Sequence, residues 1–188
     1  VTSKILDILK QENVKATFFI LGSNVDSRKD VVKRMYEEGH YLANHGYSHT
    51  YSKIYSSPQS VLDEYNECND KVKNAIEVPD YNSHLFRFPG GLAGGKYAEI
   101  KKEAKELLLQ NNIVNVDWNA LTGDAETNNL SVEFEMTRLT ETMESKNSLV
   151  ILMHDAAAKS VTADALPQII AKLKEEGYEF KNFYDIIK

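Results

Sequence analysis

The sequence predicts an α/β fold, with a largely parallel sheet or barrel wrapped by helices. Segments whose apolar residues recur at steps of three and four alternate along the chain with short, continuous apolar runs of strand length. Continuous apolar runs are typical of strands that are covered on both faces, as parallel strands between helices are. The 188 residues contain no linker or low-complexity tract, so we expect a single domain over 1–188.

The helices and strands are expected in alternation. Ser57 and Pro58 suit the N-cap and first turn of one helix, Ser131 precedes another, and Gly177 is a natural stop for a third. A βα fold begins with a strand, whereas this chain opens in a helix, so we expect a strand upstream of Val1. In chain order, the pattern predicts helices over 2–11, 26–38, 58–76, 96–110, 132–143 and 163–173, and strands over 16–21, 41–44, 84–88, 113–117 and 148–154.

Composition argues against several classes of partner. The net charge is −6, and the basic residues cluster only in pairs such as Lys101 and Lys102, so we expect no nucleic acid partner. No run of 18 apolar residues occurs, which predicts no membrane span in this chain. Cys68 is the only cysteine, so there is no disulfide framework.

Polar residues stand at the ends of the predicted strands. In parallel α/β folds, functional groups gather at the carboxyl ends of strands, where the loops converge. The residues that fit this position are His45 and His49 after "YLAN", Arg87 in "HLFRF", Asp117 and Trp118 at the end of "IVNVD", and His154 at the end of "SLVILMH".

Each of these residues also has an ordinary structural interpretation. Two histidines four apart can share a zinc ion, but an isolated pair at this spacing is common and usually binds no metal. A buried arginine needs a carboxylate or a row of carbonyls, whereas one at a sheet end can reach water. Asp117 could cap a helix and Trp118 could belong to the core. His154 could be an inert core residue or a general acid assisted by a carboxylate.

Five short motifs, taken in order, resemble the polysaccharide deacetylase family, also called the NodB homology domain or carbohydrate esterase family 4. They are "ATFFILG", "NHGYSH", "RFPGG", "VDWN" and "LMHD", and they span nearly the whole chain. The tail "ALPQIIAKLKEEGYEF" resembles that of Gram-positive peptidoglycan N-acetylglucosamine deacetylases. The resemblance implies a distorted (β/α) barrel with parallel strands, here apparently lacking its first strand.

The resemblance also implies roles for particular residues. His45 and His49 would hold a divalent metal, most often Zn²⁺, that polarises an acetamide carbonyl and activates water. His154 would be the general acid, oriented by Asp117, and Arg87 would pair with the general base. Trp118 and Leu152 would line the acetyl pocket, and the backbone after Pro89, at Gly90, would help to hold the oxyanion.

Three departures from the family pattern stand out. Gly46 replaces the Ser or Thr that usually follows the first metal histidine, which removes a hydroxyl that steadies the loop. Gly90 stands where an aromatic residue often follows the proline, which removes a pocket wall. The family's Thr-Phe-Asp-Asp-Gly-Pro motif, source of the general base and a third metal ligand, is absent, and no two aspartates are adjacent. We therefore expect an N-terminally truncated domain that is poorly active by itself.

The function that the resemblance implies is a metal-dependent hydrolase that removes N-acetyl groups from a polysaccharide. The expected partners are peptidoglycan or chitin-like N-acetylglucosamine chains, and the expected location is extracellular or at the cell envelope of a Gram-positive bacterium. One alternative is a catalytically degenerate sugar-binding module. Another is an amidase of the same fold that acts on small amides.

Overall fold

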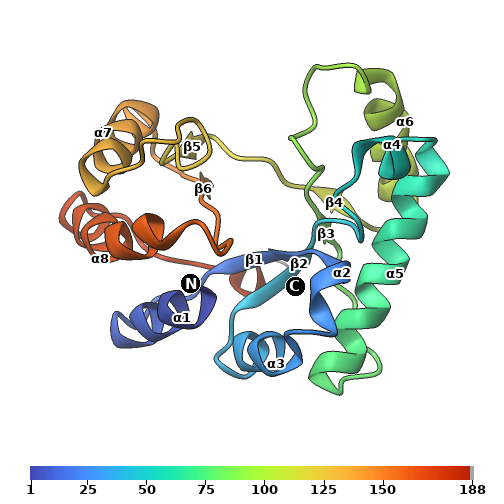
Figure 1. Ribbon diagram of the computed structural model, residues 1–188, viewed down its shortest axis with the longest axis horizontal. Coiled ribbons are helices and arrows are strands. Elements are labelled where there is room, and N and C mark those ends of the chain that lie inside the picture. Colours follow the sequence, from blue (N-terminus) through green and yellow to red (C-terminus); the bar gives the residue numbers. More distant parts are fainter. Residues whose placement is uncertain (187–188) are drawn as a thin grey trace. The chain divides into compact units, whose positions relative to one another are not determined.

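The structure, a computed structural model, describes residues 1–186 (Figure 1). It contains two compact units, which are described separately. The first comprises residues 1–15 and 118–181, and the second comprises residues 16–117 with the segment from Asn182 onward.

The second unit is built on a parallel sheet. Its strands are β1 (Thr17–Ile20), β2 (Tyr41–Asn44), β3 (Leu85–Phe86) and β4 (Val114–Asn115), in the order β1-β2-β3-β4. Phe86 pairs with Asn44 on one side and with Asn115 on the other. All three pairings are parallel, which confirms the predicted α/β class.

The helices of this unit are α2 (Gly22–Val25), α3 (Lys29–Glu37), α4 (Tyr51–Ile54), α5 (Pro58–Ile76) and α6 (Ala98–Gln110). The hydroxyl of Ser57 accepts a hydrogen bond from the backbone of Ser60 at 3.1 Å, and Pro58 occupies the first turn, as predicted. The helix predicted over 26–38 is confirmed as α3, which begins three residues later than expected, at Lys29. The short helix α2 lies before the predicted range.

The core of the second unit lies between the sheet and helices α5 and α6. Tyr55, Phe86 and Phe88 are fully buried there, and the rings of Phe86 and Phe88 meet edge to face at 5.0 Å between centroids. Strand β3 has two residues and contributes Phe86, whereas Phe88 follows two positions later, so ring packing adds to a short ladder in holding this segment.

The first unit contains a smaller parallel pair with three helices. Strand β5 (Ala120–Leu121) pairs with β6 (Ile151–Leu152), and the helices are α1 (Thr2–Gln11), α7 (Val132–Met143) and α8 (Ser160–Glu175). Leu139, Ile169 and Leu173 form part of the core between α7 and α8. None of the helices in residues 1–186 is both long and apolar enough to cross a membrane.

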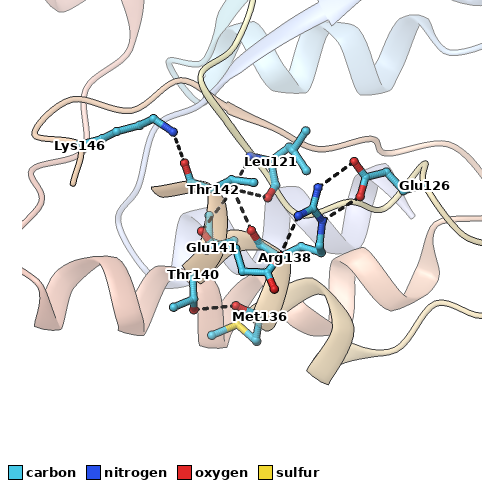
Figure 2. Close-up of polar contacts among 9 residues, drawn as sticks. Leu121, Glu126, Met136, Arg138, Thr140, Glu141, Thr142 and Lys146 are labelled. Carbon is cyan, nitrogen blue, oxygen red and sulfur yellow. Dashed lines mark hydrogen bonds and ion pairs between the residues drawn. The ribbon is translucent and has the colours of Figure 1, made fainter. Parts of the chain in front are cut away.

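A side chain of α7 completes the short strand β5 (Figure 2). The hydroxyl of Thr142 donates to the carbonyl of Leu121 at 2.9 Å and accepts from its N–H at 3.1 Å. Arg138, one turn earlier, pairs with both carboxylate oxygens of Glu126 at 2.8 and 3.1 Å and with Glu141 at 2.8 Å. The N–H and carbonyl of Leu121 are therefore satisfied by a side chain, whereas the N–H of Ala120 donates to the carbonyl of Val150.

Candidate functional site

The loop that follows β2 carries the predicted histidine pair. Asn44, the last residue of the strand, donates to the carbonyl of Tyr65 at 2.9 Å and accepts from the backbone of Gly46 at 2.9 Å. The N–H of His45 donates to the carbonyl of Ile20 in β1 at 2.9 Å. The loop therefore leaves the sheet in a direction that three hydrogen bonds fix.

The structure brings His45 and His49 together, with ring centroids 5.2 Å apart. Nδ1 of His45 lies 2.6 Å from the carbonyl of Arg87, and since a carbonyl only accepts, Nδ1 carries the proton. Nε2 is then the nitrogen with the lone pair, which is the tautomer that a metal ligand needs. Imidazole donors suit zinc, so the pair fits two positions of such a site. Within residues 1–186, no group of three His, Cys, Asp or Glu side chains gathers at one point.

His49 adopts a left-handed backbone conformation, with φ of 53°. Such a conformation is uncommon for a residue other than glycine and costs free energy, so it persists where the surroundings impose it. The imposing group is Glu64 on α5. Its Oε2 accepts from the N–H groups of Tyr47 and Ser48 at 2.9 Å each, and its Oε1 accepts from the hydroxyl of Ser48 at 2.5 Å.

Gly46 does not leave the loop unsteady, contrary to our expectation. It has φ of 79°, and a Cβ at this position would lie 2.7 Å from Cδ1 of Ile54 and 3.1 Å from Oε2 of Glu64. The space for a side chain is filled, and the steadying hydroxyl is supplied by Ser48 instead. The glycine is therefore a requirement of this loop's geometry.

Arg87 is 7 % exposed, which excludes the interpretation that it reaches water. Its Nε donates to the carbonyl of Val116 at 2.9 Å, and one terminal nitrogen donates to the carbonyl of Asp117 at 3.1 Å. The guanidinium carbon also stands 3.8 Å from the ring centroid of Phe19. Burial lowers the pKa of Arg87 to about 10, and the charge of Asp117 opposes this shift.

The turn after Arg87 is held by charged and aromatic side chains. Oδ2 of Asp117 accepts from the N–H of Leu92 at 2.9 Å, and the ammonium of Lys101 donates to the carbonyl of Gly91 at 2.7 Å. The hydroxyl of Tyr55 donates to the carbonyl of Pro89 at 2.7 Å. Asp117 thus holds this turn in place, and the alternative that it caps a helix is wrong.

Tyr51 occupies the space beside Gly90. A Cβ built at Gly90 would lie 2.4 Å from the Tyr51 hydroxyl, and the Tyr51 ring is 5.8 Å from that of His49. Tyr51 is 41 % exposed. The wall that we expected to be lost at Gly90 is therefore replaced by an aromatic side chain from α4, which the motif gave no reason to consider.

The imidazole of His154 follows β6 in the first unit, and its side chain is 43 % exposed. Its Nδ1 lies 2.8 Å from Oδ1 of Asp124, and its backbone N–H donates to Oδ2 of the same residue at 2.6 Å. The prediction that Asp117 orients His154 is wrong, since Asp124 holds that position. Because a carboxylate only accepts, Nδ1 carries the proton.

Asp124 was missed because the strand before it was missed. It follows β5, whose two residues are too short to show a pattern, and the "VDWN" segment drew attention to the earlier aspartate. The sequence feature that could have indicated Asp124 is its position shortly after the apolar pair Ala120 and Leu121, in "ALTGDA". Trp118 and Leu152, both half-buried, lie before β5 and in β6 of the same unit.

Comparison with known proteins agrees with these features. A family model described as polysaccharide deacetylase matches residues 1–110. The chain is 35% identical over 187 residues to the putative polysaccharide deacetylase YheN of Bacillus subtilis. It is 32% identical over 187 residues to a peptidoglycan-N-acetylglucosamine deacetylase of Bacillus cereus.

These alignments cover 96% and 98% of this chain but 61% and 65% of the relatives, so the chain spans less than two thirds of either one. The solved structure of a Streptococcus mutans CE4 esterase matches with a TM-score of 0.87 at 33% identity. That match covers 96% of this chain and 79% of the other. It confirms the expected NodB-like (β/α) fold class.

Proposed function

Because the chain belongs to the polysaccharide deacetylase family, we propose that it hydrolyses N-acetyl groups on a polysaccharide, with N-acetylglucosamine of peptidoglycan as the substrate class. The observation that carries this proposal is His154, an exposed imidazole whose Nδ1 is fixed on the buried carboxylate of Asp124. This arrangement presents Nε2 for proton transfer. The name of the Bacillus cereus relative supports the choice of substrate.

In the proposed reaction, His45 and His49 would hold a divalent metal, with zinc the first candidate. When bound, such an ion polarises the acetamide carbonyl and lowers the pKa of a bound water. The hydrogen bond from His45 Nδ1 to the carbonyl of Arg87 keeps the ligand tautomer, and Glu64 keeps the loop that carries both rings.

The remaining residues have separate proposed roles. His154 would protonate the amine as it leaves the tetrahedral centre, using the proton on Nε2. The N–H of Gly90 would donate to the oxyanion from the turn after Pro89, which Tyr55 and Lys101 hold. Trp118 and Leu152 would line the pocket for the acetyl methyl group. The proposed location is the cell envelope, where a peptidoglycan substrate lies.

The test is acetate release from N-acetylglucosamine oligomers and from peptidoglycan by the purified full-length protein. We expect turnover that a chelator abolishes and added zinc restores. His154→Ala should lower kcat by about 10²- to 10⁴-fold, because a general acid contributes that much. His84→Ala is the matched control, since His84 is exposed and its imidazole Nδ1 lies 3.0 Å from the carbonyl of Asn112.

Full activity of His154→Ala would remove the proposed acid. Binding of oligomers without acetate release, measured by calorimetry, would instead favour a sugar-binding module. Release of ammonia or formate from small amides, with none from glycans, would favour an amidase of this fold.

A further inference from the structure

A buried polar cluster lies behind His154 in the first unit. Its members are Thr122, Asp124, Glu135 and Thr162, which are between 0% and 2% exposed. They come from the loop that follows β5, from α7 and from the first turn of α8. A fully buried glutamate is unusual, because the charged form is costly to remove from water.

Hydrogen bonds connect Glu135 to His154 through two intermediates. The hydroxyl oxygen of Thr162 lies 3.0 Å from Oε1 of Glu135 and 3.5 Å from Oδ2 of Asp124. Asp124 in turn contacts both Nδ1 and the backbone N–H of His154, at 2.8 and 2.6 Å. A continuous path of polar contacts therefore runs from α7 to the exposed imidazole.

The number of hydrogens available along this path indicates which of the two carboxyl groups, Glu135 or Asp124, carries a proton. The Thr162 hydroxyl has one hydrogen and stands between two carboxyl groups, so both contacts are satisfied only if one carboxyl group carries a proton. Both oxygens of Asp124 already accept hydrogen bonds, one from the backbone N–H of His154 and one from its Nδ1, so Asp124 acts as the acceptor. The proton then belongs to Glu135, which donates to Thr162, and Thr162 donates to Asp124.

The surroundings of Glu135 agree with this assignment. Burial raises the pKa of Glu135, and the nearby charge of Asp124 raises it further. The hydroxyls of Thr162 and Thr122 and the ammonium of Lys159 partly oppose the shift. Among residues 1–186, neither Oε2 of Glu135 nor the hydroxyl of Thr122 has a hydrogen-bond partner within 3.5 Å, although Thr122 is close enough to affect the pKa of Glu135. A buried oxygen without a partner costs less in a neutral acid than in a carboxylate.

We propose that Glu135 is a positioning residue that holds a proton and, through the hydroxyl of Thr162, fixes Asp124 as the single negative charge behind His154. The inference rests on the proposed function only in taking His154 as the general acid. A second carboxylate at this depth would repel Asp124 and loosen the carboxylate that holds the imidazole.

The test uses NMR on the full chain and does not require turnover. The ¹³C shift of the Glu135 carboxyl group should titrate at higher pH than that of Glu133, an exposed glutamate of the same helix. Thr162→Val should speed hydrogen exchange of the His154 backbone amide about tenfold, because Asp124, its acceptor, loses a support. Thr162→Ser should restore the wild-type rate, and Glu135→Gln, a neutral isostere, should retain it.

Three results would overturn the proposal. They are titration of Glu135 together with Glu133, an unchanged exchange rate in Thr162→Val, and a Thr162→Ser variant as fast as Thr162→Val. If Thr162→Val does not fold, as judged by its amide spectrum, the carboxyl titration of the wild type and the Glu135→Gln exchange rate still decide. Glu133→Gln is the matched control for Glu135→Gln.

The proposed function and this inference can fail separately. Absence of acetate release with the expected exchange rates would reject the proposed enzyme activity and keep the positioning role of Glu135. Acetate release with a Glu135 that titrates like Glu133 would do the reverse.

Discussion

Gly46 shows at the scale of one residue how a departure from a family motif acquires a physical reason. Its φ of 79° and its contacts with Ile54 and Glu64 leave no room for a Cβ. The family's usual serine would have to enter a left-handed conformation against these neighbours. Restoring the typical residue here should therefore harm the protein.

We predict that Gly46→Ser destabilises the protein by about 2–4 kcal/mol, measured by urea unfolding. About 1–2 kcal/mol comes from the left-handed conformation, and the remainder comes from displacing Ile54 and Glu64. Gly95→Ser is the matched control, because Gly95 has φ of 80° and nothing within 4 Å of its built Cβ. Equal losses in the two variants would show that steric contact at Gly46 plays no part.

The site residues were predictable from sequence to different degrees. His45 and His49 could be paired from spacing alone, because the separation of residues within one loop is local. The partner of His154 could not, because Asp117 and Asp124 are seven apart and which one reaches the imidazole depends on where β5 ends. The burial of Glu135 gave no signal, since a glutamate in an amphipathic helix normally faces water.

At the scale of an element, α5 carries the loop of the histidine pair. Its cap at Ser57 fixes where the helix begins, and this places Glu64 under the N–H groups of Tyr47 and Ser48. The residue that caps the helix therefore also determines the position of Glu64 beneath the histidine loop, which precedes the helix in the chain.

We predict that Glu64→Gln weakens zinc binding, measured by isothermal titration calorimetry, and lowers stability by about 1–3 kcal/mol in urea. The amide keeps one acceptor for two backbone donors but loses the charge that strengthens these hydrogen bonds. Glu67→Gln on the exposed side of α5 is the control and should behave as wild type. Zinc affinity that is unchanged in Glu64→Gln would reject the role of this carboxylate in the loop.

The sequence pattern predicted long elements well and short ones poorly. Helix α5 and strand β2 match their expected ranges, because each has enough apolar residues to display its period. Strands β3, β4 and β6 are two residues long where runs of five to seven were expected. The apolar residues next to these strands pack against helices but do not form strand hydrogen bonds. A buried apolar run looks the same in the sequence whether or not it pairs with another strand.

At the scale of the whole molecule, the buried acid makes stability depend on pH. Glu135 has its pKa raised above the value of 4.5 that an ordinary glutamate shows. The folded state then binds a proton that the unfolded state releases above about pH 4.5. The contribution of Glu135 is therefore fully present below that pH and is lost as pH rises through its folded pKa.

We predict that wild-type stability falls relative to Glu135→Gln by about 1.4 kcal/mol per pH unit between pH 4.5 and the folded pKa of Glu135. Urea unfolding of both proteins across pH 4 to 8 measures this difference. All other titratable groups are shared by the two proteins, so their contributions cancel when the stabilities are subtracted. Parallel stability curves would show that Glu135 titrates alike in both states.

The fold class followed from sequence because alternation of helices and apolar runs is a property of the whole chain. Parallel pairing in both units and the family match over residues 1–110 agree with it. The division into two compact units did not follow, since the boundary at Trp118 lies inside a segment without glycine or proline.

Arg87 connects neighbouring strand ends in a way that bears on how its variants are interpreted. Its carbonyl orients His45 after β2, its guanidinium binds two carbonyls after β4, and its cationic face covers Phe19 of β1. Both its backbone and its side chain therefore hold these strand ends together. If an Arg87 variant is inactive, the first explanation is therefore that the strand ends have moved, and a direct role of Arg87 in the chemistry comes second.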